Sequence, residues 1–127
     1  MMTGIVSADL EAKLALRLQS GHEAPEIQAV IDTGFTGFLT LPSSLIVRLN
    51  LPWLCRQEGQ LADGSLHAFD VYGATVSWNG MPRMIEVEAV DAEPLIGMEM
   101  LRDHELGMIV KEGGSVTVSK IESSEVQ

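Results

Sequence analysis

Apolar and polar residues alternate along much of this chain, and the alternation limits the folds that are open to it. From residue 10 to residue 18 every second residue is apolar. Because successive side chains of a β-strand point to opposite faces, a period of two predicts half-buried strands rather than helices. The residues that share the apolar face are Leu10, Ala12, Leu14, Leu16 and Leu18.

The same alternation recurs in EIQAVID and in PRMIEVEAV. We expect Ile27, Ala29 and Ile31 to face the core in the first segment, and Ile85, Val87 and Ala89 in the second. The acidic residues beside the second set, Glu86 and Glu88 with Asp91 and Glu93, are interpreted as a solvated strand face and loop.

Turn signals separate the predicted strands at intervals of about ten residues, as in small barrels and sandwiches. Asp63-Gly64 predicts a tight hairpin between RQEGQLA and SLHAFDVYGATVSW. Asn79-Gly80 and Gly113-Gly114 predict two further turns. At 127 residues the chain has the length of one domain, and the predicted fold class is mainly β.

Two short helices are predicted between the strands. In TLPSSLIVRLNLP, Thr40 or a neighbour can cap the helix, and Pro42 stands near its first position. GMEMLRDHEL is predicted to form the second helix. Each helix follows an alternating strand and a glycine, which suggests an internal pseudo-repeat.

The charge balance makes nucleic acid an unlikely partner. Eight Lys and Arg residues oppose 18 Asp and Glu residues, which gives a formal charge of −10, and such a chain repels phosphate backbones. Cys55 is the only cysteine, so no disulfide can form within the chain. The three scattered histidines, His22, His67 and His104, indicate neither a zinc site nor a base for Cys55.

The chain starts without a basic segment followed by an apolar run, and no apolar stretch is long enough to span a bilayer. We therefore expect a cytoplasmic protein without a membrane partner.

One carboxylate stands in the most apolar part of the chain. AVIDTGFTGFLTLP, residues 29–42, is mostly apolar or small residues around Asp32. An unpaired buried carboxylate is strongly unfavourable, so such a group is normally hydrogen-bonded, paired or protonated. One interpretation is a turn aspartate that ends a strand in a monomeric β-domain. The other is a carboxylate placed there for chemistry.

The order of AVIDTGFTG, a hairpin tipped by Asp-Gly, and PLIGMEML resembles the retropepsin-like aspartic proteases, in particular their short single-domain bacterial relatives. The resemblance runs from about Gly4 to Ile121. It implies a closed barrel with a flap hairpin and one or two short helices. The implied domain covers residues 3–121, and residues 122–127 form a polar tail.

The resemblance also implies an activity, aspartic endopeptidase, with no cofactor and no metal. These enzymes activate a water between two aspartates, and this chain has half the length of a two-lobed enzyme. The second carboxylate would therefore come from a second copy in a homodimer. The substrate would be a peptide or protein.

The resemblance gives roles to individual residues. Asp32 is the catalytic acid–base, Thr33 bonds across the dimer axis, and Gly34 lets the backbone approach the catalytic pair. Phe35 lines the substrate groove. The flap that closes over substrate corresponds to Leu61, Ala62, Asp63, Gly64 and Ser65, and the structural element near the site corresponds to Leu95, Ile96 and Gly97.

Three features depart from the viral pattern. Phe35 stands where viral members commonly have a small residue, and Met98 stands where they have arginine, with Arg102 one turn further on. The polar tail does not resemble the interleaved terminal strands of the viral dimer, so we expect an interface that is built differently. The alternative function is a catalytically weak or inactive module of the same fold that dimerises and binds peptides.

Overall fold

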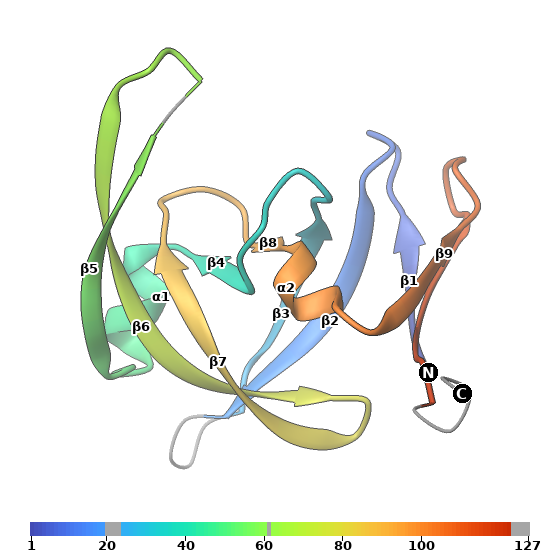
Figure 1. Cartoon of the computed structure of the whole chain (residues 1–127). Helices are drawn as coiled ribbons and strands as arrows, with labels where there is room; N and C mark the ends of the chain where they lie inside the picture. Colours follow the sequence, from blue (N-terminus) through green and yellow to red (C-terminus); the bar gives the residue numbers. More distant parts are fainter. Residues whose placement is uncertain (20–23, 61, 123–127) are drawn as a thin grey trace.

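Most of the chain is β-structure. The computed structural model describes residues 1–19, 24–60 and 62–122, and strands with two short helices dominate it (Figure 1). The mainly-β prediction is confirmed. The strands are β1 Met2–Val6, β2 Ala12–Gln19, β3 Glu26–Ile31, β4 Leu39–Leu41, β5 Trp53–Gln60, β6 Leu66–Trp78, β7 Met81–Ala89, β8 Leu95–Ile96, β9 His104–Met108 and β10 Ser115–Lys120, and the helices are α1 Ser43–Arg48 and α2 Met98–Leu101.

Six of the described strands close into a ring. They pair in the order β6, β7, β4, β8, β3 and β2, and β6 then returns to β2 with Leu18 opposite Val76. The apolar faces of the strands form one buried core, because every second side chain points inward. Its fully buried members include Leu14, Leu16, Leu18, Leu39, Leu41, Val76, Val87 and Ile96.

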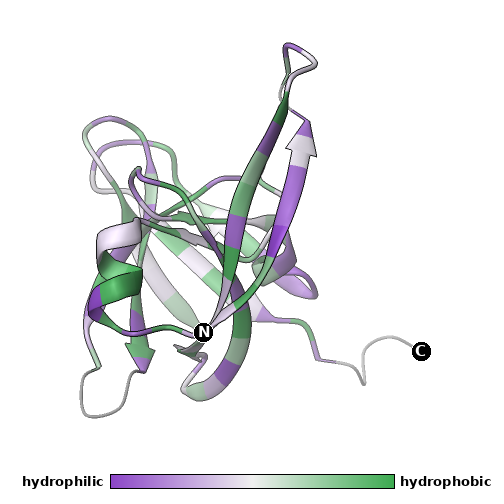
Figure 2. Ribbon diagram, turned by 90° about the vertical axis from the view of Figure 1, so that its left-hand side faces the viewer, coloured by the Kyte–Doolittle hydropathy of each residue, from purple (hydrophilic) through white to green (hydrophobic). Residues whose placement is uncertain are grey.

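Further strands extend the sheet beyond the ring. β1, β10 and β9 continue it from β2 in antiparallel order, and β5 pairs with β6 at the opposite edge. The β5–β6 hairpin stands clear of the body, as both Figure 1 and Figure 2 show. β1 begins at Met2, one residue before the predicted start of the domain, and residues 123–127 of the predicted tail lie outside the described residues.

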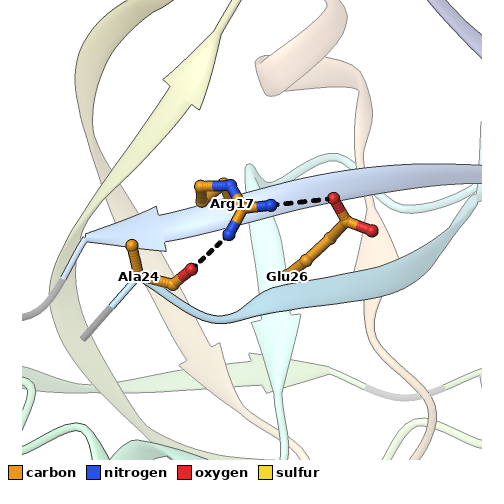
Figure 3. A network of polar contacts seen from close by, with 3 residues as sticks. All are labelled: Arg17, Ala24 and Glu26. Carbon is orange, nitrogen blue, oxygen red and sulfur yellow. Dashed lines mark hydrogen bonds and ion pairs between the residues drawn. The ribbon is translucent and has the colours of Figure 1, made fainter.

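An exposed polar cluster joins β2 and β3 at the end of their hairpin (Figure 3). The Arg17 guanidinium donates to the Ala24 carbonyl at 2.6 Å and to the Glu26 carboxylate at 3.1 Å. Arg17 and Glu26 are direct cross-strand neighbours. Exposed ion pairs contribute only about 1 kcal/mol or less, so the register is set mainly by the buried leucines of β2.

The predicted pseudo-repeat is present in the topology. β3, β4 and α1 form one unit, and β7, β8 and α2 form the other. β3 runs parallel to β8, β7 runs parallel to β4, and β4 and β8 are antiparallel. The Asp32 amide donates to Ile96 at 2.9 Å, and the Val90 amide donates to Leu41 at 3.0 Å. Asp32 and Val90 therefore hold equivalent positions at the ends of β3 and β7.

Two predictions about strands and helices were wrong. Leu10 is 59 % exposed with a φ of 61°, because it belongs to the β1–β2 turn and not to the strand that starts at Ala12. The second helix covers only Met98–Leu101, since the chain turns at Asp103, with a φ of 65°, and continues as β9.

Thr40 does not cap α1, which was one of the possibilities left open. It is buried in β4, and its hydroxyl accepts the Leu95 amide at 2.9 Å. The hydroxyl therefore joins β4 to the start of β8. None of the described helices is long and apolar enough to cross a membrane.

Candidate active site

Asp32 is the first residue after β3, and its backbone is fixed by the strand beside it. Its amide donates to the Ile96 carbonyl of β8, and its own carbonyl accepts the Phe35 amide at 3.1 Å. Its carboxylate Oδ1 accepts the Gly34 amide at 2.9 Å. The side chain is partly exposed and makes no ion pair among the described residues. The apolar run thus buries the strand while the carboxylate leaves the core at the strand's end.

The segment from Leu95 to Gly97 supports the loop of residues 32–37, which we call the Asp32 loop. Gly97 donates to Phe38 at 3.0 Å, Met98 donates to Phe35 at 2.8 Å, and Glu99 donates to Gly37 at 3.1 Å. Gly97 is buried, and a Cβ there would lie 2.8 Å from the Phe35 carbonyl oxygen. The structure therefore brings together two segments that the sequence separates by about sixty residues.

A hollow of about 430 Å³ lies beside the Asp32 loop. Gly34 and Phe35 line it from the loop. The hairpin contributes Gln57, Phe69 and Val71 from its base. The remaining lining residues are Thr36, Gly37, Phe38, Glu86, Glu88 and Glu99. The hollow therefore lies between the Asp32 loop and the β5–β6 hairpin.

The tip of the hairpin is a tight turn, as predicted. Gly64 has a φ of 87°, a conformation that favours glycine. The amide and hydroxyl of Ser65 donate to the Asp63 carboxylate at 2.9 and 2.6 Å, and these bonds lower the pKa of Asp63. Ala62, Asp63, Gly64 and Ser65 are exposed and do not line the hollow, and Leu61 lies outside the described residues.

Glu88 was interpreted as part of a solvated face, and that interpretation is wrong. Its side chain is half-buried against Gly37 and lines the hollow. Burial raises its pKa, and the neighbouring charge of Glu86 raises it further. The alternation of β7 carried a signal for this, because Ile85 and Val87 face the core and therefore turn Glu88 toward the hairpin.

We expect Glu88→Gln to stabilise the protein at neutral pH. A raised carboxyl pKa means that the folded state disfavours the charged form, so the cost is present at pH 7 and disappears below the ordinary value of 4.5. The urea midpoint of the variant should exceed that of the wild type at pH 7, and the difference should vanish near pH 4. Glu105→Gln, on an exposed position of β9, is the control. Equal urea midpoints of the wild type and Glu88→Gln at pH 7 would contradict the inference that burial disfavours the charged form of Glu88.

Asp91 has a structural role that the sequence did not reveal. Its carboxylate accepts the amide of Ser43, the first residue of α1, at 2.8 Å. That backbone bond lowers the pKa of Asp91, and a side-chain hydrogen bond from Ser43 lowers it further by a smaller amount. Forty-eight residues separate the two partners, so no local capping pattern could have indicated the contact.

Asp91→Ala should lower the urea midpoint at pH 7, because the start of α1 loses its acceptor. The Asp91 contribution is complete above the ordinary pKa of 3.8 and is lost as the pH falls through the lowered folded value. The difference between the urea midpoints of the wild type and Asp91→Ala should therefore become smaller in strong acid. Glu105→Gln again serves as the control. A gap that persists unchanged in strong acid would show that the charged carboxylate is not responsible.

No ion pair joins Arg102 to Asp32 among the described residues. Its guanidinium pairs with Glu99 at 2.9 Å, and it lines another hollow with Trp78 and His104. His104 accepts the Trp78 indole N–H at 3.0 Å. Thr33, the predicted axis contact, is exposed. Across the described ranges no three His, Cys, Asp or Glu side chains are grouped as metal ligands would be.

Comparison with known proteins adds no family. No family model matches the chain, and no curated protein matches it. The residues around Asp32 therefore carry the functional case.

Proposed function

We propose that this protein is an aspartic endopeptidase with a retropepsin-like closed barrel, active as a homodimer. The observation that carries the proposal is the placement of Asp32. Its carboxylate leaves the core at the end of a strand, and the Gly34 amide and β8 hold its position. Asp32 does not itself line the hollow, but Gly34 and Phe35 of the same loop do. A turn aspartate in a plain β-domain would not require the second supporting segment at Leu95–Gly97.

One carboxylate is not enough for the reaction. A two-fold axis beside Asp32 would place the same residue of a second copy next to it. Two adjacent carboxylates share one proton, because both cannot easily ionise together. The unprotonated carboxylate takes a proton from a water, whose oxygen attacks the amide carbon. The protonated carboxylate donates to the carbonyl oxygen, which gives a tetrahedral diol. The aspartate that took the proton from water then donates it to the nitrogen, the C–N bond breaks, and a diol hydroxyl returns its proton to the other aspartate, which releases an amine and an acid.

The surrounding residues then take their predicted roles. The Gly34 amide orients Asp32, and Thr33 is exposed on the same turn, where it can meet the other copy. Phe35 lines the groove for a peptide. The β5–β6 hairpin serves as the flap, and closure of its tip would exclude water from the site. The cytoplasm remains the expected location.

A second candidate function is a peptide-binding module without catalysis. The observation that favours it is the position of β5 at the edge of the sheet. An edge strand offers unpaired backbone groups to an extended peptide. In that case Asp32 would bind a backbone amide of the peptide and not activate water.

Incubation of purified protein with a mixed peptide library from about pH 3 to pH 7.5, read by mass spectrometry, separates the two functions. We expect cleavage at internal peptide bonds by a dimeric species. Tight peptide binding with no cleavage after long incubation would support the module. A monomer that neither binds nor cleaves peptides would support the interpretation of Asp32 as a turn residue in a monomeric β-domain.

A further inference from the structure

One end of the sheet carries apolar side chains that are exposed in the described part of the chain. β3, β1 and β9 end there, and β2 and β10 begin there, so the Asp32 loop, the β1–β2 turn and the β9–β10 turn share that end (Figure 1). The exposed apolar residues at or next to the two turns, which we call the turn patch, are Ile5, Leu10, Met108, Ile109 and Val110, and they are 40–64 % exposed.

Backbone hydrogen bonds fix the turn patch relative to Asp32. Val6 donates to Gly114 at 2.9 Å and accepts the Gly113 amide at 2.9 Å, so the two turns are joined. β2, which leads away from the first turn, pairs directly with β3. The turn patch and Asp32 are therefore parts of one rigid sheet end.

We propose that the turn patch is the interface through which a second copy of this chain docks. The inference rests on the proposed function, because the site with a single Asp32 is incomplete without a second copy. A two-fold axis running along this end of the sheet would place Asp32 of one copy next to Asp32 of the other. On the β9 side of Asp32, the same axis would place the turn patch of one copy against the turn patch of the other. Exposed apolar side chains gathered at one end of a sheet offer an interaction surface, and an isologous contact needs one such surface only.

The terminal strands are not available for this purpose. β1 pairs with β10 on one side and with β2 on the other, and β10 lies between β1 and β9. Their backbone groups are therefore used within the chain. An interface of interleaved terminal strands would require these pairings to break, whereas the turn patch is already exposed.

Charges at the edge of the turn patch fit a second copy as well. Asp9 stands on the β1–β2 turn, and Lys111 stands on the β9–β10 turn. Lys111 has no ion pair among the described residues. In an isologous contact the Lys111 ammonium of one copy can meet the Asp9 carboxylate of the other. Such a pair offsets part of the repulsion between two chains of charge −10.

Sedimentation over a range of concentrations tests the proposal with Ile109→Glu. The control is Val47→Glu, which puts the same charge on a residue of α1 that is 77 % exposed and lies away from the turns. We expect the wild type and the control to dimerise alike. Ile109→Glu should raise the dimer dissociation constant at least about a hundredfold, since it places two carboxylates in an apolar contact. Cleavage should fall in parallel and return at high protein concentration.

Leu10→Lys is a second variant on the other turn, which guards against misfolding of the first. If the wild type dimerises and cleaves while both variants do so equally well, the turn patch is not the interface, and the proposed function survives. If the wild type is monomeric at every concentration, both the interface and the shared site are wrong.

Discussion

Replacement of Asp32 by asparagine should abolish peptide cleavage while the fold is retained. The amide has the shape of the carboxylate, and its oxygen can still accept the Gly34 amide, which lies 2.9 Å from Oδ1 in the wild type. It cannot take a proton from water, so the general base is lost. We expect cleavage of library peptides to fall at least about a thousandfold, at the scale that general acid–base groups contribute.

The matched control for this variant is Asp103→Asn. Asp103 is exposed with a φ of 65°, a conformation that asparagine tolerates, and it lies next to β9. The Asp103→Asn variant should cleave library peptides at the same rate as the wild type. Cleavage by Asp32→Asn at the wild-type rate would refute the catalytic role, provided that sedimentation and circular dichroism show an unchanged protein.

Gly97→Ala should have the largest effect on stability among single methyl additions near the site. The new Cβ would lie 2.6 Å from the Phe35 ring and 2.8 Å from the Phe35 carbonyl oxygen. Hydrogen bonds from residues 97–99 to residues 35–38 hold the backbone on both sides, so it cannot move without breaking them. We expect a loss of about 2 kcal/mol or more in the free energy of unfolding, together with reduced cleavage.

Gly73→Ala is the control for the added methyl group. Gly73 lies in β6, and the nearest atom to a Cβ there is 3.6 Å away, on Leu54. Urea unfolding should show little change for this variant. Equal stabilities of the two variants would mean that residues 97–99 do not pack tightly against residues 35–38.

Local patterns predicted the strands well, because alternation and turn residues act over a few neighbours. The buried leucines of β2 and the turn at Gly64 follow directly from them. The prediction that Leu10 faces the core was wrong because the alternation in the sequence extends beyond the strand into the β1–β2 turn. Periodicity alone cannot locate the first residue of a strand. The predicted length of the second helix was wrong for a similar reason, since the chain turns at Asp103.

The site was predictable only in part. Asp32 could be found because a carboxylate in an apolar run requires a physical reason. The Asp91 contact with Ser43 and the half-buried Glu88 depend on segments that meet only after the ring closes. No local pattern specifies such meetings. For the same reason, the residues of the hollow come from four separate parts of the sequence: the segment of residues 34–38, the β5–β6 hairpin, β7 and α2.

A subunit-mixing experiment tests the shared site most directly. Wild-type protein is mixed with increasing amounts of Asp32→Asn protein and left to exchange subunits, and peptide cleavage is measured at constant total concentration. If each site needs Asp32 from both copies, cleavage should fall as the square of the wild-type fraction. Cleavage proportional to the wild-type fraction would show that one chain suffices, and would contradict the homodimeric mechanism.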